Sequence, residues 1–179
     1  MAFIDCQNDF IDGALGVGYQ KWADAYNYME QELLDKDKFD EFVFTLDSHP
    51  KNHCSFKDQG GPWPVHCVKN EPGFELYWKF EKYMRDKDFI YTMLQKGLDP
   101  EKEEYGIDVL KFDKDEIDEV NIAGLCTDYC VKESAIMTAK AHPEVAIKVH
   151  LKGSAFITQE TALSAIKEME KVSNIELVY

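Results

Sequence analysis

Short apolar runs alternate along this chain with longer segments in which apolar residues recur every three or four positions. The short runs are rich in β-branched and aromatic residues, which is typical of strands, and they occupy residues 2–4, 41–46, 89–94, 119–124, 144–150 and 175–179. Segments with helical spacing occupy residues 19–35, 74–84, 128–141 and 160–171. Several strand runs are continuously apolar, as in parallel strands that are covered on both faces. The pattern predicts an α/β fold, a three-layer α/β/α sandwich around a central six-stranded, mostly parallel sheet.

Two segments fall outside this alternation. Residues 47–73 form the longest irregular stretch, with three histidines, two cysteines and four prolines. A loop of this length within a compact domain is usually functional or disordered, and the density of Trp, His and Cys argues against disorder. We therefore expect a functional loop here, and its histidines make it the candidate metal and substrate loop. Residues 99–119 are strongly acidic, and we expect a solvated connection that contains a short strand or helix. With 179 residues and no internal repeat, the chain is expected to form a single domain over residues 1–179.

The charge and composition of the chain disfavour several kinds of binding partner and cellular location. The formal net charge of −14 disfavours nucleic acid and anionic membranes, because both would repel the protein. No stretch approaches the roughly 20 apolar residues of a spanning helix, and the N-terminus lacks a signal-peptide pattern, so we expect a cytoplasmic protein. The five cysteines are an odd number without a CxxC pair, which fits free thiols better than a disulfide framework.

Candidate chemistry lies at the predicted strand ends, because sites in open parallel sheets form beyond the carboxyl ends of the strands. Asp5 follows the first predicted strand, Lys96 the third and Cys130 the fourth. Thr127 or Asp128 could cap a helix that starts there, and the helix start would favour the thiolate of Cys130, which is a better nucleophile than the thiol. The alternative is that Cys130 is a small buried core residue.

The two charged residues also have two interpretations each. Asp5 is costly to bury unless it is paired, and it lies where a base for a neighbouring thiol is needed, but it could instead brace the following loop, as Asp9 could. Lys96 is either a surface lysine or, beside Asp5 and a thiolate, the cation that keeps the carboxylate ionised. These residues taken one at a time leave both alternatives open.

A candidate metal site follows the second predicted strand. Asp47 and His49 alternate along an extended segment and so point to the same side. A third ligand from the loop would complete a facial site open to water, and we assign it to His66, within the stiff WPVHC segment. His53 is a candidate for a contact behind the ligands or with substrate. The two loop cysteines could also ligate zinc, and a solvated surface cluster is the alternative to a metal site.

Phe10 and Trp63 are bulky aromatics in loops at the same edge of the predicted sheet, where they could sandwich a ring or cover a small loop core. Together these positions resemble the nicotinamidase/pyrazinamidase group of the isochorismatase-like cysteine hydrolases. The resemblance rests, in the family's order, on the motifs IDCQNDF, LDSHPKNHCSF, GPWPVHCV, KG and AGLCTDYCV. The metal loop separates nicotinamidases from relatives that share only the Asp, Lys and Cys.

The resemblance implies a role for each candidate residue. The catalytic roles are general base for Asp5, its charged partner for Lys96 and nucleophile for Cys130. The oxyanion hole would be formed by the backbone N–H groups of Cys126 and Cys130, after a cis peptide bond between Leu125 and Cys126. One divalent metal ion, with zinc as first choice and iron or manganese as alternatives, would be held by Asp47, His49 and His66. The substrate ring would lie between Phe10 and Trp63.

The implied reaction is hydrolysis of nicotinamide to nicotinate and ammonia, the first step in recycling nicotinamide into NAD. Pyrazinamide is expected to react as well. One alternative is a related cysteine amidase that acts on another small amide or carbamoyl compound, and a second is an inactive ligand-binding module on the same fold. The resemblance also allows a homo-oligomer.

Overall fold

The computed structural model describes residues 1–110 and 117–179. Its centre is a six-stranded sheet in the order β3-β2-β1-β4-β5-β6, and neighbouring strands are parallel throughout. The strands are β1 (Ala2–Ile4), β2 (Phe42–Asp47), β3 (Tyr91–Lys96), β4 (Glu119–Leu125), β5 (Ala146–Ala155) and β6 (Ile175–Val178). The six predicted strands are therefore all present, and the sheet is fully rather than mostly parallel.

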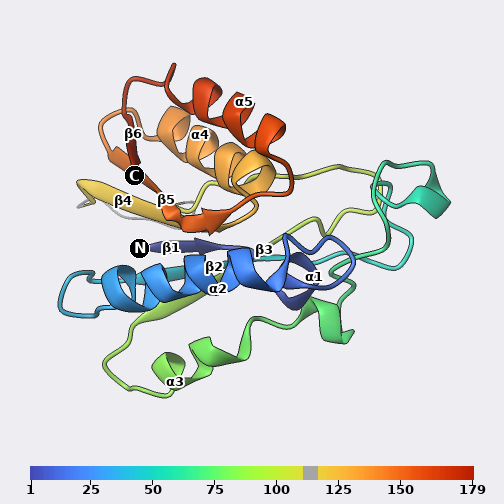
Figure 1. The fold of residues 1–179 in the computed structure, drawn as a ribbon, viewed down its shortest axis with the longest axis horizontal. Coiled ribbons are helices and arrows are strands. Elements are labelled where there is room, and N and C mark those ends of the chain that lie inside the picture. Colours follow the sequence, from blue (N-terminus) through green and yellow to red (C-terminus); the bar gives the residue numbers. More distant parts are fainter. Residues whose placement is uncertain (111–116) are drawn as a thin grey trace.

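Helices cover both faces of this sheet (Figure 1). One face carries α4 (Lys132–Ala141) and α5 (Gln159–Met169). The opposite face carries α1 (Asn8–Ile11), α2 (Tyr19–Tyr28) and α3 (Glu81–Met84). The predicted three-layer α/β/α sandwich is confirmed. None of the described helices is long and apolar enough to cross a membrane.

The core consists of two apolar layers, because successive residues of a strand point to opposite faces of the sheet. Phe3 of β1 packs in the layer under α2, with Trp22 and Phe44. Ile4, the next residue, packs in the layer under α4 and α5, with Ile147. All five side chains are fully buried. Burial on both faces explains why the strand sequences are continuously apolar.

The direction of strand addition reverses between β1 and β4, which are neighbours although the strands between them in sequence lie on the far side of β1. Such a reversal opens a crevice at the carboxyl ends of the two strands. Gly124 lets β4 approach β1 there: its φ is +135°, and an added Cβ would lie 2.2 Å from the carbonyl oxygen of Ile4. Asp5 and Cys126 are the residues that follow the two strands into this crevice.

The predicted helix over residues 74–84 is largely wrong. The segment contains 3₁₀ turns at Pro72–Phe74 and Trp78–Phe80, and only Glu81–Met84 is α-helical. Leu76 pairs instead with Gln7 in an isolated antiparallel bridge, and the Tyr77 N–H donates to the carbonyl of Cys6 at 2.9 Å. These contacts with a distant part of the chain hold residues 75–77 extended, which the local pattern does not reveal.

Other boundaries also differ from the prediction. The helix predicted over residues 19–35 is α-helical to Tyr28 and π-helical over Met29–Leu33, and the predicted strand over 89–94 lies two residues later. β5 continues past the predicted end at residue 150, because the polar His150 and Ser154 are buried with hydrogen-bond partners. Of the acidic connection predicted over 99–119, residues 111–116 lie outside the described residues, and residues 99–110 contain neither helix nor strand.

Candidate active site

The three catalytic candidates meet at the switch point of the sheet. Asp5 follows β1, Lys96 is the last residue of β3, and Cys130 lies one turn after β4. The Lys96 Nζ atom is 2.9 Å from Asp5 Oδ2 and 3.6 Å from Cys130 Sγ. All three side chains are buried, so Lys96 is not the surface lysine of the alternative interpretation. The carboxyl ends of three strands thus bring a carboxylate, an ammonium and a thiol together.

Asp5 is held in a specific geometry. Its φ is +44°, an unusual value for a residue other than glycine, and its backbone N–H donates to the carbonyl and hydroxyl oxygens of Thr45. The Thr45 hydroxyl donates in turn to Asp5 Oδ1 at 2.6 Å. The other oxygen, Oδ2, accepts no aligned hydrogen bond from a described residue although it is close to Lys96. Burial raises the pKa of Asp5 against the opposing attraction of Lys96, which suits a group that must accept and return a proton.

Lys96 also connects Asp5 and Cys130 to the candidate metal ligands. Its Nζ atom lies 3.0 Å from Asp47 Oδ1. Burial would lower the pKa of Lys96, but the nearby Asp47 and Asp5 carboxylates outweigh it and hold that pKa well above its usual value. Burial likewise opposes ionisation of Asp47, yet Lys96 and the adjacent histidines keep the pKa of Asp47 well below its usual value. Lys96 therefore remains a cation between two carboxylates.

Cys130 corrects two sequence-based expectations. Burial, opposed by Lys96 and assisted by Asp5, raises the pKa of the Cys130 thiol well above its usual value, which is the opposite direction to the one expected from a helix start. The turn Thr127–Val131 is π-helical, and neither Thr127 nor Asp128 caps it, since the cap position is Cys126 and no side chain donates or accepts there. Asp128 instead accepts hydrogen bonds from the segment that leads into α5. A thiol with a raised pKa needs a base to become a nucleophile, and the carboxylate of Asp5 is the candidate for that role.

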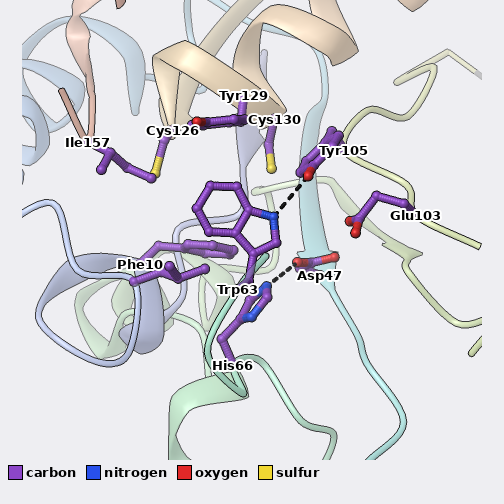
Figure 2. A pocket seen from close by; sticks show the side chains of 11 residues that line it. Phe10, Asp47, Trp63, His66, Glu103, Tyr105, Cys126, Tyr129, Cys130 and Ile157 are labelled. Atoms are coloured by element: carbon purple, nitrogen blue, oxygen red, sulfur yellow. Dashed lines mark hydrogen bonds and ion pairs between the residues drawn. The ribbon is translucent and has the colours of Figure 1, made fainter. Parts of the chain in front are cut away.

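The backbone between β4 and Cys130 has the expected cis peptide bond, between Leu125 and Cys126. The carbonyl oxygen of Cys126 accepts from the N–H groups of both Tyr129 and Val131, at 3.0 and 3.1 Å. Cys126 and Cys130 both line one small pocket, with Tyr129 between them in the view of Figure 2. The oxyanion role of their N–H groups stays a prediction.

The candidate metal ligands converge as well. One atom from each of Asp47, His49 and His66 lies within 4.8 Å of the others, and all three residues are buried. His49 Nδ1 is 3.1 Å from the carbonyl of Gly97, and His66 Nδ1 is 2.8 Å from that of Pro64. In the neutral tautomer that has its proton on Nδ1, each ring donates to that carbonyl, and its Nε2 lone pair would be available to a metal ion. Both Nε2 atoms face Asp47 Oδ2, at 2.9 and 3.5 Å, so the donor set fits a divalent ion such as zinc.

His53 lies behind this group rather than in it. Its ring is 3.9 Å from the ring of His49, centroid to centroid. Its Nδ1 lies 2.7 Å from the Ser55 hydroxyl and its Nε2 lies 3.0 Å from the carbonyl of Lys102, so both nitrogens already have partners. His53 therefore packs against a candidate ligand and is not placed to be one itself.

Two residues that the sequence analysis did not single out support the site. The Gln7 amide donates to the carbonyl oxygens of Asp47 and Phe74 and accepts from the Asp47 N–H, which fixes the backbone of Asp47. Gly97 has a φ of +70°, and an added Cβ would lie 2.6 Å from His49 Cε1 and 2.8 Å from Asp47 Oδ1. Gln7 is part of the quoted motif IDCQNDF, but its partners are 40 and 67 residues away in sequence.

A pocket lies between the thiol and the metal-ligand group (Figure 2). Phe10 and Trp63 both line it, as expected, with the Phe10 ring edge-on to His66 and the Trp63 ring edge-on to Tyr129. Glu103 and Tyr105 line it too. They belong to the acidic connection that we expected to be solvated, and the only available signal was that this connection begins soon after the end of β3.

Comparison with known proteins identifies the family of this chain. The isochorismatase domain model matches residues 1–176. The nicotinamidase/pyrazinamidase of Mycobacterium tuberculosis is 26% identical over an alignment that covers 99% of this chain and 97% of the relative. The nicotinamidase of Escherichia coli is 30% identical over 74% of this chain and 72% of its own.

Solved structures are similar to this chain along nearly its whole length. The pyrazinamidase of Pyrococcus horikoshii in complex with zinc has a TM-score of 0.79 and 30% identity, with 99% of this chain and 96% of that chain covered. The yeast nicotinamidase has a TM-score of 0.80 and 26% identity, with 99% and 97% covered. The family model spans almost the full length of the chain, and the fold is that of the solved nicotinamidase structures. The chain therefore belongs to the isochorismatase family.

Proposed function

We propose that this protein is a metal-dependent nicotinamidase, a cysteine amidohydrolase that converts nicotinamide to nicotinate and ammonia and also hydrolyses pyrazinamide. The observation that carries the proposal is the position of Lys96 Nζ, within 3.6 Å of Cys130, Asp5 and Asp47. One ammonium thereby joins a nucleophile and base to a candidate metal ligand. Relatives named nicotinamidase that align along nearly the whole chain support the choice of substrate.

The first half of the reaction forms a thioester. Asp5 accepts the proton of the Cys130 thiol, and the sulfur attacks the carboxamide carbon, so a C–S bond forms and the carbonyl π electrons move to oxygen. The N–H groups of Cys126 and Cys130 would stabilise this oxyanion. When the oxyanion collapses, the C–N bond breaks, and Asp5 returns its proton to the departing nitrogen, which leaves as ammonia. Lys96 keeps Asp5 ionised between these transfers.

The second half releases the product. Asp5 accepts a proton from a water molecule, whose oxygen attacks the thioester carbon, and the C–S bond breaks on collapse of the second tetrahedral oxyanion. The Cys130 sulfur recovers its proton from Asp5, and the carboxylic acid loses its own proton to the solvent and leaves as nicotinate. Each step uses Asp5 in alternating roles, which agrees with a carboxyl pKa raised by burial.

Asp47, His49 and His66 would hold the metal ion, with zinc as first choice and iron or manganese as alternatives. A divalent ion there supplies a Lewis acid that can bind a pyridine nitrogen directly or through water. Phe10 and Trp63 would flank the ring and orient its carboxamide toward Cys130. We place the reaction in the recycling of nicotinamide to NAD, in the cytoplasm.

The decisive experiment measures ammonia release from nicotinamide by the metal-loaded protein beside Cys130→Ala. We expect release by the wild type and none above background by the variant, since no other side chain replaces the attacking sulfur. Release by Cys130→Ala at the wild-type rate would contradict the nucleophile assignment. A non-aromatic amide hydrolysed much faster than nicotinamide would contradict the substrate assignment.

A further inference from the structure

The pocket beside Cys130 is too small for the proposed substrate. Its volume is about 20 Å³. This volume counts only the space that the centre of a water molecule can reach, and roughly 10–15 Å³ of such space holds one water molecule. The pocket therefore has room for about one water and not for an aromatic ring. A lining side chain must therefore move before a ring can lie between Phe10 and Trp63.

Trp63 is the lining residue placed to move. Its indole occupies the middle of the pocket in Figure 2, between Cys130 on one side and His66 on the other, and it is only half-buried. The backbone at this position is fixed, because the Trp63 N–H donates to the carbonyl of Ser55 at 2.9 Å and its carbonyl accepts from the Lys57 N–H at 2.7 Å. Prolines on both sides restrict it further. Any displacement must come from rotation of the side chain.

The indole is held by Tyr105. Trp63 Nε1 donates to the Tyr105 hydroxyl at 2.9 Å. Tyr105 itself lies on a segment attached to α4, since the N–H of Ile107 donates to the Ser134 hydroxyl at 3.2 Å. Tyr129 also contacts the indole, edge to face with centroids 5.1 Å apart, but its hydroxyl makes no hydrogen bond to another described residue. The Tyr105 hydroxyl is thus a directional restraint on the indole that Tyr129 does not provide.

We propose that Tyr105 is a positioning residue, which holds Trp63 as a wall of the pocket through this hydrogen bond and releases it when an aromatic amide enters or the acid leaves. The identity of that ligand rests on the proposed function, but the restraint itself does not. Rotation of the indole breaks one neutral hydrogen bond, which contributes roughly 1 kcal/mol, or about a fivefold change in an equilibrium constant. Opening at that cost is compatible with turnover.

The first test uses the free protein and measures acrylamide quenching of the Trp63 fluorescence. The Trp63 signal is obtained as the difference between each protein and the same protein carrying Trp63→Phe, because Trp22 and Trp78 also emit. We expect Tyr105→Phe to increase quenching and shift the emission of Trp63 to the red. Tyr129→Phe is the matched control and should leave both as in the wild type. Equal quenching in Tyr105→Phe and the wild type would overturn the proposal.

The second test uses steady-state kinetics with nicotinamide. Tyr105→Phe should lower KM by up to about fivefold and leave kcat within about twofold, because the free protein no longer has to break the Trp63–Tyr105 hydrogen bond to admit the ring, while the reacting groups are unchanged. A fall in kcat at unchanged KM would contradict a positioning role. If the wild type does not hydrolyse nicotinamide, the proposed function fails, and the quenching comparison still decides the role of Tyr105.

Discussion

Gly97 lies directly after Lys96 and beneath two of the candidate metal ligands, where a side chain has no room. Gly97→Ala should lower metal occupancy at least tenfold, because its Cβ would displace the His49 ring or the Asp47 carboxylate, 2.6 and 2.8 Å away. Metal content measured by mass spectrometry after dialysis checks this. Gly60→Ala is the matched control, since Gly60 also has a positive φ of 90° but an added Cβ would have nothing within 4 Å. Equal metal loss in both variants would mean that backbone strain alone is responsible.

Asp5 is assigned to proton transfer, whereas Asp9 braces the neighbouring loop by accepting from the Cys67 N–H at 2.7 Å. Asp5→Asn should reduce kcat by about 10²–10⁴ while metal content stays at the wild-type value, because an amide keeps the shape of the carboxylate but cannot accept the thiol proton. Single-turnover kinetics beside metal analysis measure both quantities. Wild-type kcat in Asp5→Asn would assign the base elsewhere.

The turn that carries Cys130 is joined to α5 through Asp128. This buried carboxylate accepts from the N–H groups of Ile157 and Thr158 and from the Thr161 hydroxyl. Asp128→Ala should lower the free energy of unfolding by about 3 kcal/mol, because these donors lose their acceptor in a largely buried region. Urea unfolding measures the loss. Asp24→Ala, at an exposed site, should cost less than about 0.5 kcal/mol, and similar losses in the two variants would contradict the argument.

His150 joins β5 to α2 and β4 in its neutral form. Its Nδ1 accepts from the Tyr28 hydroxyl and its Nε2 donates to Asn121 Oδ1. Burial, and then the nearby Lys148, lower the pKa of His150 from 6.5 to about 4. Between these pH values the unfolded chain binds a proton that the folded chain does not, so this contribution to stability is lost as pH falls from 6.5 to 4.

The corresponding measurement is urea unfolding at pH 7 and pH 5. The loss of stability between them should be smaller in His150→Gln than in the wild type, since glutamine does not titrate and can still donate to Asn121. An identical pH dependence in the two proteins would assign the loss to other groups.

At the scale of the whole molecule, the metal-ligand group joins the end of β2 to the long loop that follows it, so an ion should stabilise the fold. Zinc at 100 times its Kd contributes about 2.7 kcal/mol, which corresponds to roughly 5–10 °C in Tm for a chain of this size. Thermal unfolding of chelator-treated protein, with and without added zinc, measures the shift. His49→Ala should show no zinc-dependent shift, and full activity of metal-free wild type would contradict metal dependence.

The amino-acid sequence by itself determined the fold class and the positions of the main candidate site residues. Apolar runs that alternate with helical segments specify a doubly covered parallel sheet, and the carboxyl ends of parallel strands share one edge. Asp5, Lys96 and Cys130 each follow such a run, so their meeting could be predicted without knowing the distances between them. The histidines of the metal loop were likewise recognisable by residue type and spacing.

Only the tertiary structure decided features that depend on contacts between distant segments. The residues 75–77 are extended because they pair with the loop after β1, and the Cys130 thiol has a raised pKa because other elements bury it. Tyr105 meets Trp63 across 42 positions of sequence, and no local pattern encodes that contact. Periodicity reports which face of an element is buried, whereas burial of individual polar groups and hydrogen bonds across the pocket arise only when the elements pack together.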